Sequence, residues 1–360
     1  MATEKKRPRG LKGSAIAKAN KKSKVEEPTE LPENAQTVVI DKEVEEGDEV
    51  GEAAALFESA LEKLDAADPS GALPLLRGTI HESDRILRNH QSENPLPSLF
   101  YYTYGLALYE LGRLTDDEEF EPYLDAAEER LNDALEHDTE LGNKIHIGLV
   151  KVWLAKASNA VSEDEQTIPK LATKALDKLN DETLANVPSK SIIELADIVL
   201  NHGELYDDLA ACDKFRTWAE NALEKVLKDE PNNANALSAL GLSKLSLANY
   251  YLDHIDEEQN EDNLAKEEEK ALQEFVHSKN YFESAKQELV KINQVTPQIL
   301  SDLAEAYLNV ANLTLKEDEQ AEIYKKAVEN IKEAKALIDE KKLEFSLPEA
   351  LTSFLEEFEA

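Results

Sequence analysis

The chain has few of the residues that interrupt or cross-link a polypeptide. It contains one cysteine, 12 glycines and 13 prolines in 360 residues, and aromatic side chains make up 6%. Because Cys212 is alone, it excludes an internal disulfide and a cysteine-based metal cage. Alanine, leucine, glutamate and lysine dominate the rest, and this composition favours long helices over a β-rich fold.

Long apolar segments are also missing. No stretch approaches the roughly 18 apolar residues that a membrane-spanning helix needs. The basic N-terminus is not followed by the apolar region of a secretory signal. We therefore expect a soluble, intracellular protein with no membrane partner.

The charges are divided between two segments of opposite sign. Residues 1–24 hold nine basic residues and one acidic residue, a net of +8, whereas the remaining residues hold 31 basic and 74 acidic residues, a net of −43. This asymmetry indicates that the basic segment has a partner of its own. The acidic body is expected to repel nucleic acid and to attract basic proteins, although an acidity that only maintains solubility explains the composition equally well.

Three regions follow from the pattern along the chain. Residues 1–35, which we call the basic arm, are predicted to be disordered because they contain almost nothing to bury. Residues 36–49 are predicted to be an extended acidic linker that begins with a short apolar island, Thr37–Ile40. Residues 50–360 carry apolar side chains at three- and four-residue steps, which predicts a helical-repeat domain.

Two stretches share the same order of helix, proline and helix. In the first, Pro231 separates Ala219, Leu223 and Val226 from Leu237, Leu240 and Gly241. In the second, Pro297 separates Ala285, Leu289 and Ile292 from Leu303, Ala306 and Tyr307. In a tetratricopeptide repeat, helix B of one unit, a proline stop and helix A of the next unit follow in this order.

A third candidate repeat begins at Leu99–Leu111, where Gly105 lies between Tyr104 and Leu108. Its helix B would contain Ala127, Leu131 and Ala134. The spacing between the small residues exceeds the consensus, so the repeats are degenerate. We predict an all-α fold, a tetratricopeptide-like helical-repeat solenoid with degenerate, long-helix repeats, and an irregular helical bundle is the alternative. Further helices are predicted at Ile145–Ala160, Leu171–Leu179, Ile192–Leu200 and Leu209–Leu227, and a last helix is predicted to open with a capping box at Ser346–Glu349.

The sequence offers no recognisable catalytic site. None of the seven histidines lies in a His-Glu-x-x-His motif or pairs with another histidine four residues away, so we expect surface or helix-end histidines. No Gly-x-Gly-x-x-Gly or Walker A loop is present. The chain is therefore not expected to be an enzyme, and no cofactor or metal is predicted.

The helical region suggests a binding surface without a known peptide clamp. The aromatic residues Phe100, Tyr101, Tyr102, Tyr104 and Tyr109 are predicted to lie mainly in the core, with one or two facing a concave surface. Solenoids that grip a C-terminal carboxylate need lysine and asparagine at fixed places on their A helices. The matching places hold Tyr102, Leu106, Ser238, Leu242, Ala304 and Leu308. We therefore expect the partner to present a folded or basic surface.

The basic arm contains two clusters typical of a nuclear import signal. The first is formed by Lys5, Lys6, Arg7 and Arg9, and the second by Lys21, Lys22 and Lys24. Such clusters fit the acidic grooves of import receptors by charge pairing. A nonspecific contact with RNA or DNA phosphates is the alternative, which the acidic body opposes.

The arm and linker also resemble a known family. Lys6–Gly13, leading into Ala17–Lys22, resembles the opening of the fungal enhancer-of-translation-termination family. Thr37–Val44, followed by Glu46–Val50, resembles the short segment before the first helix of that family. Arg9 stands where a more apolar residue is expected.

The resemblance implies an all-helical, tetratricopeptide-like fold and a regulatory function. One family member restrains a prolyl-hydroxylase-like 2-oxoglutarate/Fe(II) dioxygenase and is its nuclear import adaptor. Another acts with the equivalent dioxygenase in translation termination and hypoxic gene control. The expected protein is a non-enzymatic adaptor that is found in the nucleus and also in the cytoplasm. Its expected partners are the dioxygenase, an import receptor, and the ribosome or termination machinery. An acidic chaperone for basic proteins, such as histones or ribosomal proteins, is the alternative function.

Overall fold

The computed structural model describes residues 42, 44–45, 47–115, 120–137, 141–161, 167–255 and 264–359. These residues form thirteen α-helices and no strand, so the predicted all-α fold is confirmed. The basic arm and most of the predicted linker at 36–49 lie outside the described residues. The boundaries of these two regions remain predictions.

The helices divide into two compact units. The first unit, Met1–Ala160 with Pro169–Ala185, contains α1 (Glu49–Asp65), α2 (Pro69–Asn89), α3 (Ser98–Leu114), α4 (Phe120–Glu136), α5 (Asn143–Ser158) and α6 (Lys170–Lys178). The second unit, Val161–Ile168 with Asn186–Ala360, contains α7 (Ser189–Gly203), α8 (Leu209–Asp229), α9 (Ala234–Asp253), α10 (Lys266–Lys291), α11 (Pro297–Asn312), α12 (Glu317–Lys341) and α13 (Glu349–Glu359).

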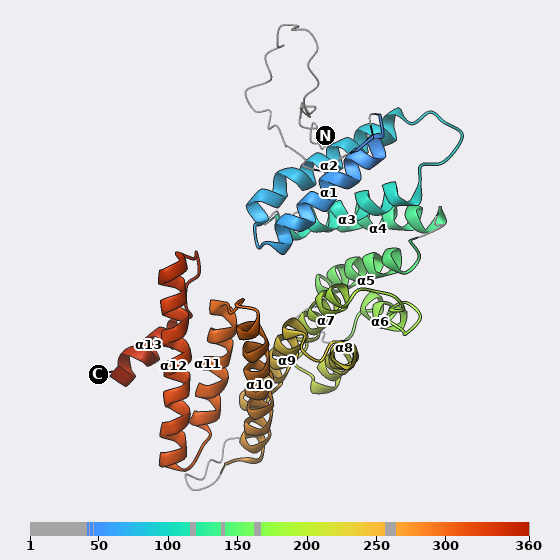
Figure 1. The fold of residues 1–360 in the computed structure, drawn as a ribbon. Coiled ribbons are helices and arrows are strands. Elements are labelled where there is room, and N and C mark those ends of the chain that lie inside the picture. Colours follow the sequence, from blue (N-terminus) through green and yellow to red (C-terminus); the bar gives the residue numbers. More distant parts are fainter. Residues whose placement is uncertain are drawn as a thin grey trace, which may run out of the picture. The chain divides into compact units, whose positions relative to one another are not determined.

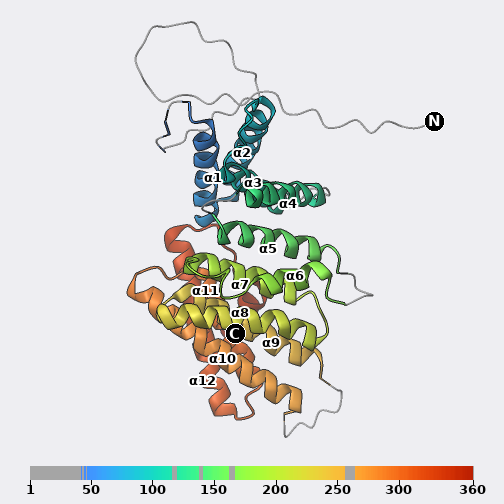
Figure 2. The ribbon, with the colours of Figure 1, turned by 90° about the vertical axis from the view of Figure 1, so that its right-hand side faces the viewer.

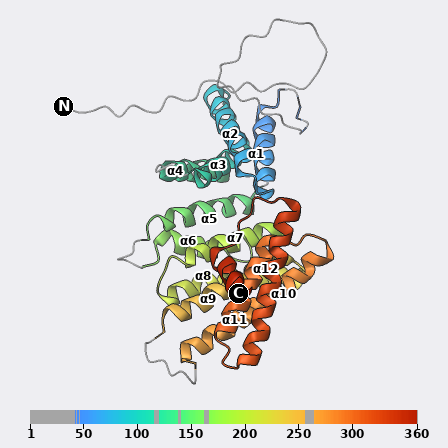
Figure 3. The same cartoon turned by 90° about the vertical axis from the view of Figure 1, so that its left-hand side faces the viewer.

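Consecutive helices pack as pairs within each unit. In the first unit α1 packs on α2, α3 on α4, and α5 on α6 (Figure 2). In the second unit α7 packs on α8, α9 on α10, and α11 on α12, and Figure 1 shows α10, α11 and α12 side by side. We call the first helix of each pair the A helix and the second the B helix. The last helix, α13, lies against α11 and α12 and ends the stack (Figure 3).

Apolar stripes join each pair to its neighbour, as a helical repeat requires. Leu56 of α1, Leu76 of α2 and Leu111 of α3 share one core cluster. Another cluster joins Phe282 of α10 to Leu303 of α11. In these clusters a helix pair completes its core against the neighbouring pair of the same unit, which is the packing of a solenoid.

Two glycines allow an A helix to approach its B helix closely. A Cβ atom on Gly105 would lie 2.8 Å from Cγ of Leu131, and one on Gly241 would lie 2.5 Å from the Phe282 ring. Any larger side chain at these positions would push the two helices apart. The sequence prediction that Gly105 and Gly241 fill the small position of a repeat is consistent with this packing.

The two prolines that the sequence presents as equivalent have different positions. Pro231 lies in the loop between α8 and α9, whereas Pro297 is the first residue of α11, where its missing N–H is not needed. The helix after Pro297 therefore starts three residues earlier than the pattern predicts. Ala304 is thus the counterpart of Gly241, and both are the eighth residue of an A helix.

Asparagine and aspartate residues define several helix starts. Asp48, Asp68, Asp208 and Asn233 accept hydrogen bonds from backbone N–H groups in the first turns of α1, α2, α8 and α9. Such caps contribute about 1 kcal/mol each. The predicted capping box at Ser346–Glu349 is wrong, because α13 starts at Glu349, and the N–H groups of Leu351 and Thr352 donate to the carbonyl oxygen of Pro348.

The aromatic group of α3 belongs mainly to the core, as predicted. Phe100, Tyr101, Tyr104 and Tyr109 are buried, and Tyr102 is half-buried. The Tyr104 hydroxyl reaches beyond its own helix and donates to a carboxylate of the preceding B helix, at Asp84.

This contact recurs along the chain. Four A helices donate a hydrogen bond to a carboxylate of the preceding B helix: Tyr104 to Asp84, Trp153 to Glu128, Ser243 to Glu220, and Tyr307 to Glu283. The repeated bond connects one helix pair to the next within each unit.

Candidate functional site

The residues predicted to form the import signal lie outside the described part of the chain. Lys5, Lys6, Arg7, Arg9, Lys21, Lys22 and Lys24 all precede residue 42, which is the first described residue. Their role therefore remains a prediction. The described helices carry the candidate binding surface.

The A helices of the second unit present one set of matching positions. Counted from the first residue of α7, α9 and α11, the ninth residues are Asp197, Leu242 and Glu305, the thirteenth are Asn201, Ser246 and Asn309, and the sixteenth are Glu204, Asn249 and Asn312. None of these nine residues is buried. We call them the A face. Because A helices stack side by side in a helical repeat, matching positions form rows across neighbouring helices.

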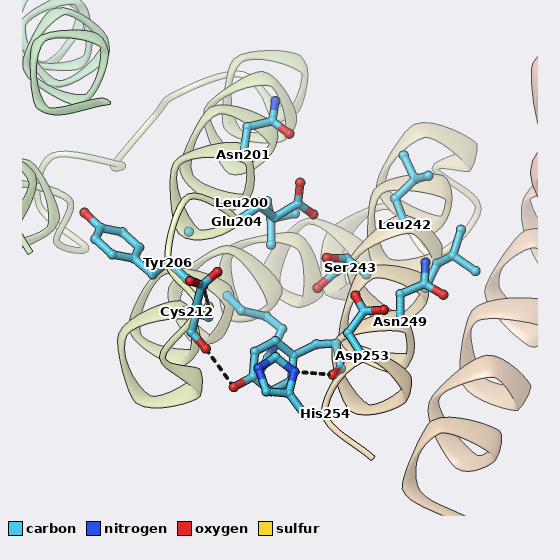
Figure 4. A pocket seen from close by; sticks show the side chains of 16 residues that line it. Leu200, Asn201, Glu204, Tyr206, Cys212, Leu242, Ser243, Asn249, Asp253 and His254 are labelled. Carbon is cyan, nitrogen blue, oxygen red and sulfur yellow. Dashed lines mark hydrogen bonds between the residues drawn. The ribbon is translucent and has the colours of Figure 1, made fainter. Parts of the chain in front are cut away.

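Part of the A face lines a hollow in the second unit. The hollow has a volume of about 580 Å³ and lies between α7, the start of α8 and the second half of α9. Asn201 and Glu204 lie on the α7 side, and Leu242, Asn249 and Asp253 lie on the α9 side (Figure 4). The hollow therefore brings together rows of two A helices that are separated in the sequence.

An aromatic cluster forms the wall of the hollow where α7 turns into α8. The rings of Tyr206 and Phe215 are stacked with centroids 5.6 Å apart, and the Tyr206 hydroxyl lies 2.9 Å from Nε2 of His202. Cys212 donates from Sγ to the carbonyl oxygen of Tyr206 at 2.8 Å. These contacts fix the loop that ends α7, so that Glu204 is held at the rim.

Two titratable groups in this wall are kept neutral by burial. His202 is 2% exposed, and desolvation lowers its pKa to about 4, so it is uncharged at pH 7. Desolvation also raises the pKa of the Cys212 thiol, which makes it a poor nucleophile. His202 lies in the last turn of α7, a helix end as the sequence predicts, but it is buried there against Phe215.

The hollow exposes carboxylates and amides without a free cation. Among the described residues, the side chains of Glu204, Asp253, Asn201 and Asn249 have no hydrogen-bond or ion-pair partner. Arg216 of α8 also lines the hollow, but it pairs with Asp213 of its own helix. A positively charged group that entered the hollow would therefore meet unpaired acceptors.

Lysines lie between the helices and not on the A face. Lys244, the sole basic residue of α9, lies 2.9 Å from Oε1 of Glu220 and 3.6 Å from Glu274, which belong to the two flanking B helices. The sequence of α11 contains no basic residue. The A face of the second unit is therefore acidic because its cations are engaged elsewhere or missing.

Carboxylates on α11 and α7 are crowded. Asp302 is 9% exposed and accepts a hydrogen bond from Nε2 of Gln298 at 2.6 Å, and desolvation with the nearby Glu305 raises its pKa to about 6. Burial also raises the pKa of Glu305. Desolvation and Glu194 raise the pKa of Asp197 to about 6. Each of these groups would be stabilised in its charged form by a nearby cation.

The positions that match a carboxylate clamp in the sequence differ in their exposure. Leu242 is 46% exposed in the hollow, as an A-face residue. Ala304 is buried. The reason is that α11 starts at Pro297, three residues earlier than the repeat pattern predicts, so each residue of α11 occupies a later position of the helix than expected. The counterpart of Leu242 on α11 is therefore Glu305. The sequence did not reveal the row of Asn201, Ser246 and Asn309, because only the true helix starts bring these residues into register.

The A face offers exposed hydrogen-bonding groups that suit the binding of a partner. Among the described residues, no group of three or more histidine, cysteine, aspartate or glutamate side chains is arranged to hold a metal ion. In the same part of the chain, no helix is both long and apolar enough to cross a membrane. Paired helices with an exposed, hydrogen-bonding A face define a helical-repeat binding protein.

Comparisons with known proteins identify the family that this binding protein resembles. Residues 1–165 match the family model described as nuclear pore complex subunit Nro1. The negative regulator of ofd1 from Schizosaccharomyces pombe is 27% identical to the chain, across 91% of this chain and 94% of the relative. Enhancer of translation termination 1 from Candida albicans is 30% identical, across 42% of this chain and 35% of the relative. The chain is thus similar to Nro1 and to the fungal enhancers of translation termination, so the resemblance seen in its first 50 residues is confirmed.

Solved structures support the fold. A structure described as "The hypoxic regulator of sterol synthesis Nro1 is a nuclear import adaptor" matches with a TM-score of 0.52 and 23% identity, across 87% of this chain and 94% of that chain. A second crystal form of S. pombe Nro1 matches with a TM-score of 0.54 and 22% identity, across 91% of this chain and all of that chain. The predicted helical-repeat solenoid is confirmed by this likeness and by the paired helices.

Proposed function

We propose that the chain is a non-enzymatic adaptor of the nucleus that binds a prolyl-hydroxylase-like 2-oxoglutarate dioxygenase and restrains or delivers it. The observation that carries the proposal is the similarity to the negative regulator of ofd1 along 94% of that protein's length. A match over nearly the whole relative supports a shared function better than a match to one segment. The basic arm supplies the features of an import signal that an adaptor needs.

The surface of the helical region supports binding over catalysis. The hollow between α7 and α9 contains unpaired amides and carboxylates, while the buried His202 is held neutral behind Tyr206 and Phe215. Repeat proteins use such exposed A-helix faces to hold other macromolecules. We place the dioxygenase on the helical region and the import receptor on the arm.

Electrostatics predict how the complex depends on salt. Outside residues 1–24 the chain has a net charge of −43, so encounter with a partner that presents a basic surface is accelerated at long range. Screening shortens this range from roughly 30 Å at 0.01 M salt to about 10 Å at 0.1 M. The association rate should therefore fall as salt is added, while the dissociation rate changes less.

The test is the purified pair. The chain and the dioxygenase of the same genome are mixed and analysed by size-exclusion chromatography with light scattering, and association is followed by surface plasmon resonance at several ionic strengths. A one-to-one complex with a salt-sensitive association rate is expected. The absence of a complex at low ionic strength would refute the assignment of this partner.

The alternative function, an acidic chaperone for basic proteins, makes a different prediction in the same assay. A chaperone would bind histones or ribosomal proteins about as well as the dioxygenase, because net charge alone would drive binding. An adaptor should prefer the dioxygenase by at least an order of magnitude when histones H2A and H2B and a basic ribosomal protein are used as competitors.

The names of the relatives add a finer proposal. Several relatives are called enhancer of translation termination 1, and a solved relative is described as a hypoxic regulator of sterol synthesis. We extend the proposal to correct translation termination and hypoxic gene regulation. Deletion of the gene for this chain in its own organism should raise read-through of a stop-codon reporter. The same deletion in a strain that lacks the dioxygenase tests whether the effect depends on the dioxygenase.

A further inference from the structure

We infer that the A face of the second unit binds a linear segment of a partner protein that is extended and carries lysine or arginine side chains, and that the hollow between α7 and α9 is the centre of this site. The inference goes beyond the proposed adaptor function, because it concerns the chemical form of the bound segment and holds for whichever protein carries it. Asparagine amides would hold the backbone of the segment, and carboxylates would pair with its basic side chains.

Unpaired amides recur along the A face. Asn201 of α7 and Asn249 of α9 line the hollow (Figure 4), and Asn309 of α11 continues the row of Asn201. None of these three side chains has a hydrogen-bond partner among the described residues. An asparagine amide can both donate to a peptide carbonyl and accept from a peptide N–H. It therefore suits an extended segment, whose backbone groups are not already paired within the segment.

The spacing of the A helices also suits an extended segment. Within the second unit α7 contacts α9, and α9 contacts α11. Packed helices lie about 8–10 Å apart, and an extended chain advances about 3.3 Å per residue. A segment that runs across the A helices therefore passes one helix about every three residues. A helical segment would pair its own backbone groups and leave the asparagines unused.

The carboxylates of the hollow require a basic segment. Glu204 on the α7 side and Asp253 on the α9 side are unpaired among the described residues, whereas Arg216 is engaged by Asp213. A neutral or acidic segment would cover both carboxylates without compensation, which is unfavourable. The rest of the unit favours the same sign of charge, since residues 186–360 hold 18 basic and 37 acidic residues.

The hollow also has room and an apolar surface for long basic side chains. Its volume of about 580 Å³ lies within the range of roughly 300–1,000 Å³ that is usual for ligand pockets. Leu242 is 46% exposed in the hollow, and the alkyl stem of a lysine or arginine can pack on it while the charged group reaches a carboxylate. The amides distinguish this occupant from a small cation such as a polyamine, which has no peptide groups to bond.

The first experiment selects the segment without assuming which protein carries it. A phage library of linear twelve-residue peptides is selected on the full-length chain, and the enriched peptides are synthesised and measured by fluorescence anisotropy at low and high salt. The enriched peptides are expected to contain basic residues about three positions apart and to bind more weakly as salt is added. A selection without enriched peptides, or with enriched peptides that lack basic residues, would overturn the proposal.

Substitutions in the hollow separate the contributions of charge and amides. Glu204→Gln with Asp253→Asn should weaken binding of the enriched peptide about ten-fold and reduce its salt dependence, because two ion pairs are lost. Asn201→Ala with Asn249→Ala should weaken binding several-fold and leave the salt dependence unchanged, because neutral hydrogen bonds are lost. All four side chains are exposed, so both variants should keep the melting temperature of the wild type.

Matched variants on B helices are the controls. Glu224→Gln with Asp229→Asn removes two exposed charges from α8. Asn221→Ala with Asn280→Ala removes two exposed amides from α8 and α10. Both controls should bind the peptide as the wild type does. Equal loss in the charge variants of the hollow and of α8 would show that only net charge matters, and unchanged affinity in both hollow variants would place the peptide elsewhere, so either result would overturn the proposal.

The last experiment tests recognition of the backbone. Methylation of single backbone nitrogens removes N–H donors from the peptide without changing its charge. Binding to the wild type should fall about five-fold or more for at least one methylated position, and this loss should shrink in the asparagine variant. No effect at any position, or spermine that binds as tightly as the peptide, would refute an extended polypeptide as the occupant. Because no experiment contains the dioxygenase, this site can fail while the adaptor function stands, and the reverse also holds.

Discussion

Single residues set the distance between paired helices. Gly241 lets α9 pack against the Phe282 ring of α10, whereas a Cβ atom on Gly78 of α2 would lie 3.8 Å from Leu56, an ordinary contact. The two glycines thus differ in their surroundings although both lie inside helices. The sequence indicated the role of Gly241 through its place in the repeat, but it could not separate a required glycine from a tolerated one.

We predict opposite effects for the same substitution at these positions. Gly241→Ala should destabilise the protein by about 1–3 kcal/mol, because the added carbon forces Phe282 to move. Gly78→Ala should stabilise it by about 0.5–1 kcal/mol, because alanine loses less conformational entropy in a helix. Urea denaturation followed by circular dichroism measures both. A stabilising Gly241→Ala would contradict the close approach of α9 and α10.

A buried carboxylate makes stability depend on pH in a defined window. The folded-state pKa of Asp302 is raised to about 6 from its ordinary value of 3.8, so its charged form is disfavoured by folding. Below pH 3.8 the group is neutral in both states and costs nothing. As pH rises from about 4 to 6 the unfolded state ionises first, and stability is lost until both states are charged.

Asp302→Asn should remove this cost, since an amide oxygen can still accept from Gln298. At pH 7 the variant is expected to be more stable than the wild type by about 2 kcal/mol, and at pH 4 the two should agree. Thermal unfolding at a series of pH values tests this prediction. A difference that does not change with pH would show that Asp302 is not the titrating group. Glu305→Gln, on a half-buried carboxylate whose pKa is also raised, provides the comparison.

At the scale of elements, the hydrogen bonds between helix pairs are the feature that the sequence predicts least well. Tyr307 of α11 donates to Glu283 of α10, and desolvation together with this bond raises the pKa of the Tyr307 phenol. The sequence pattern placed Tyr307 at the small position of a repeat. The structure instead places it three residues further along the helix, facing the preceding pair.

Tyr307→Phe should therefore destabilise the second unit by about 1–2 kcal/mol, because the Glu283 carboxylate loses a partly buried donor. Tyr324→Phe is the matched control, because the Tyr324 hydroxyl donates to Asn312 at an exposed site, where its loss should change stability by less than about 0.5 kcal/mol. Both variants keep the ring, so differences in denaturation report the hydroxyl alone. Equal effects would argue against a structural role for the bond between pairs.

The helices themselves were largely predictable from the sequence. Their apolar periodicity gave the existence of α3, α5, α6, α7 and α8 with starts and ends near those observed. The start of α11 was missed, because a proline fits equally well in a loop or at the first position of a helix. That single ambiguity hid the place of Asn309 in one row with Asn201 and Ser246.

At the scale of the whole molecule, charge and fold have separate roles. The basic arm and the acidic body were visible in the sequence, and the body's helices prove to form two repeat units. Neither composition nor periodicity could locate the hollow, because it requires helices from different pairs. The similarity to Nro1 and to the enhancers of translation termination is what supports the proposed regulatory partner.

The adaptor function predicts that the arm determines where the dioxygenase is found. Replacing Lys5, Lys6, Arg7, Arg9, Lys21, Lys22 and Lys24 by alanine should leave dioxygenase binding intact while removing the contact with the import receptor. A variant with the same number of exposed lysines replaced on α10 and α12 controls for the change in net charge.

The most direct measurement is the nuclear fraction of a fluorescently tagged dioxygenase in living cells. It is compared among cells with the wild-type chain, the arm variant, the control variant and no chain. The adaptor account predicts a high nuclear fraction with the wild type and the control, and a fall to the level of the deletion with the arm variant. An unchanged nuclear fraction in the deletion strain would contradict the account.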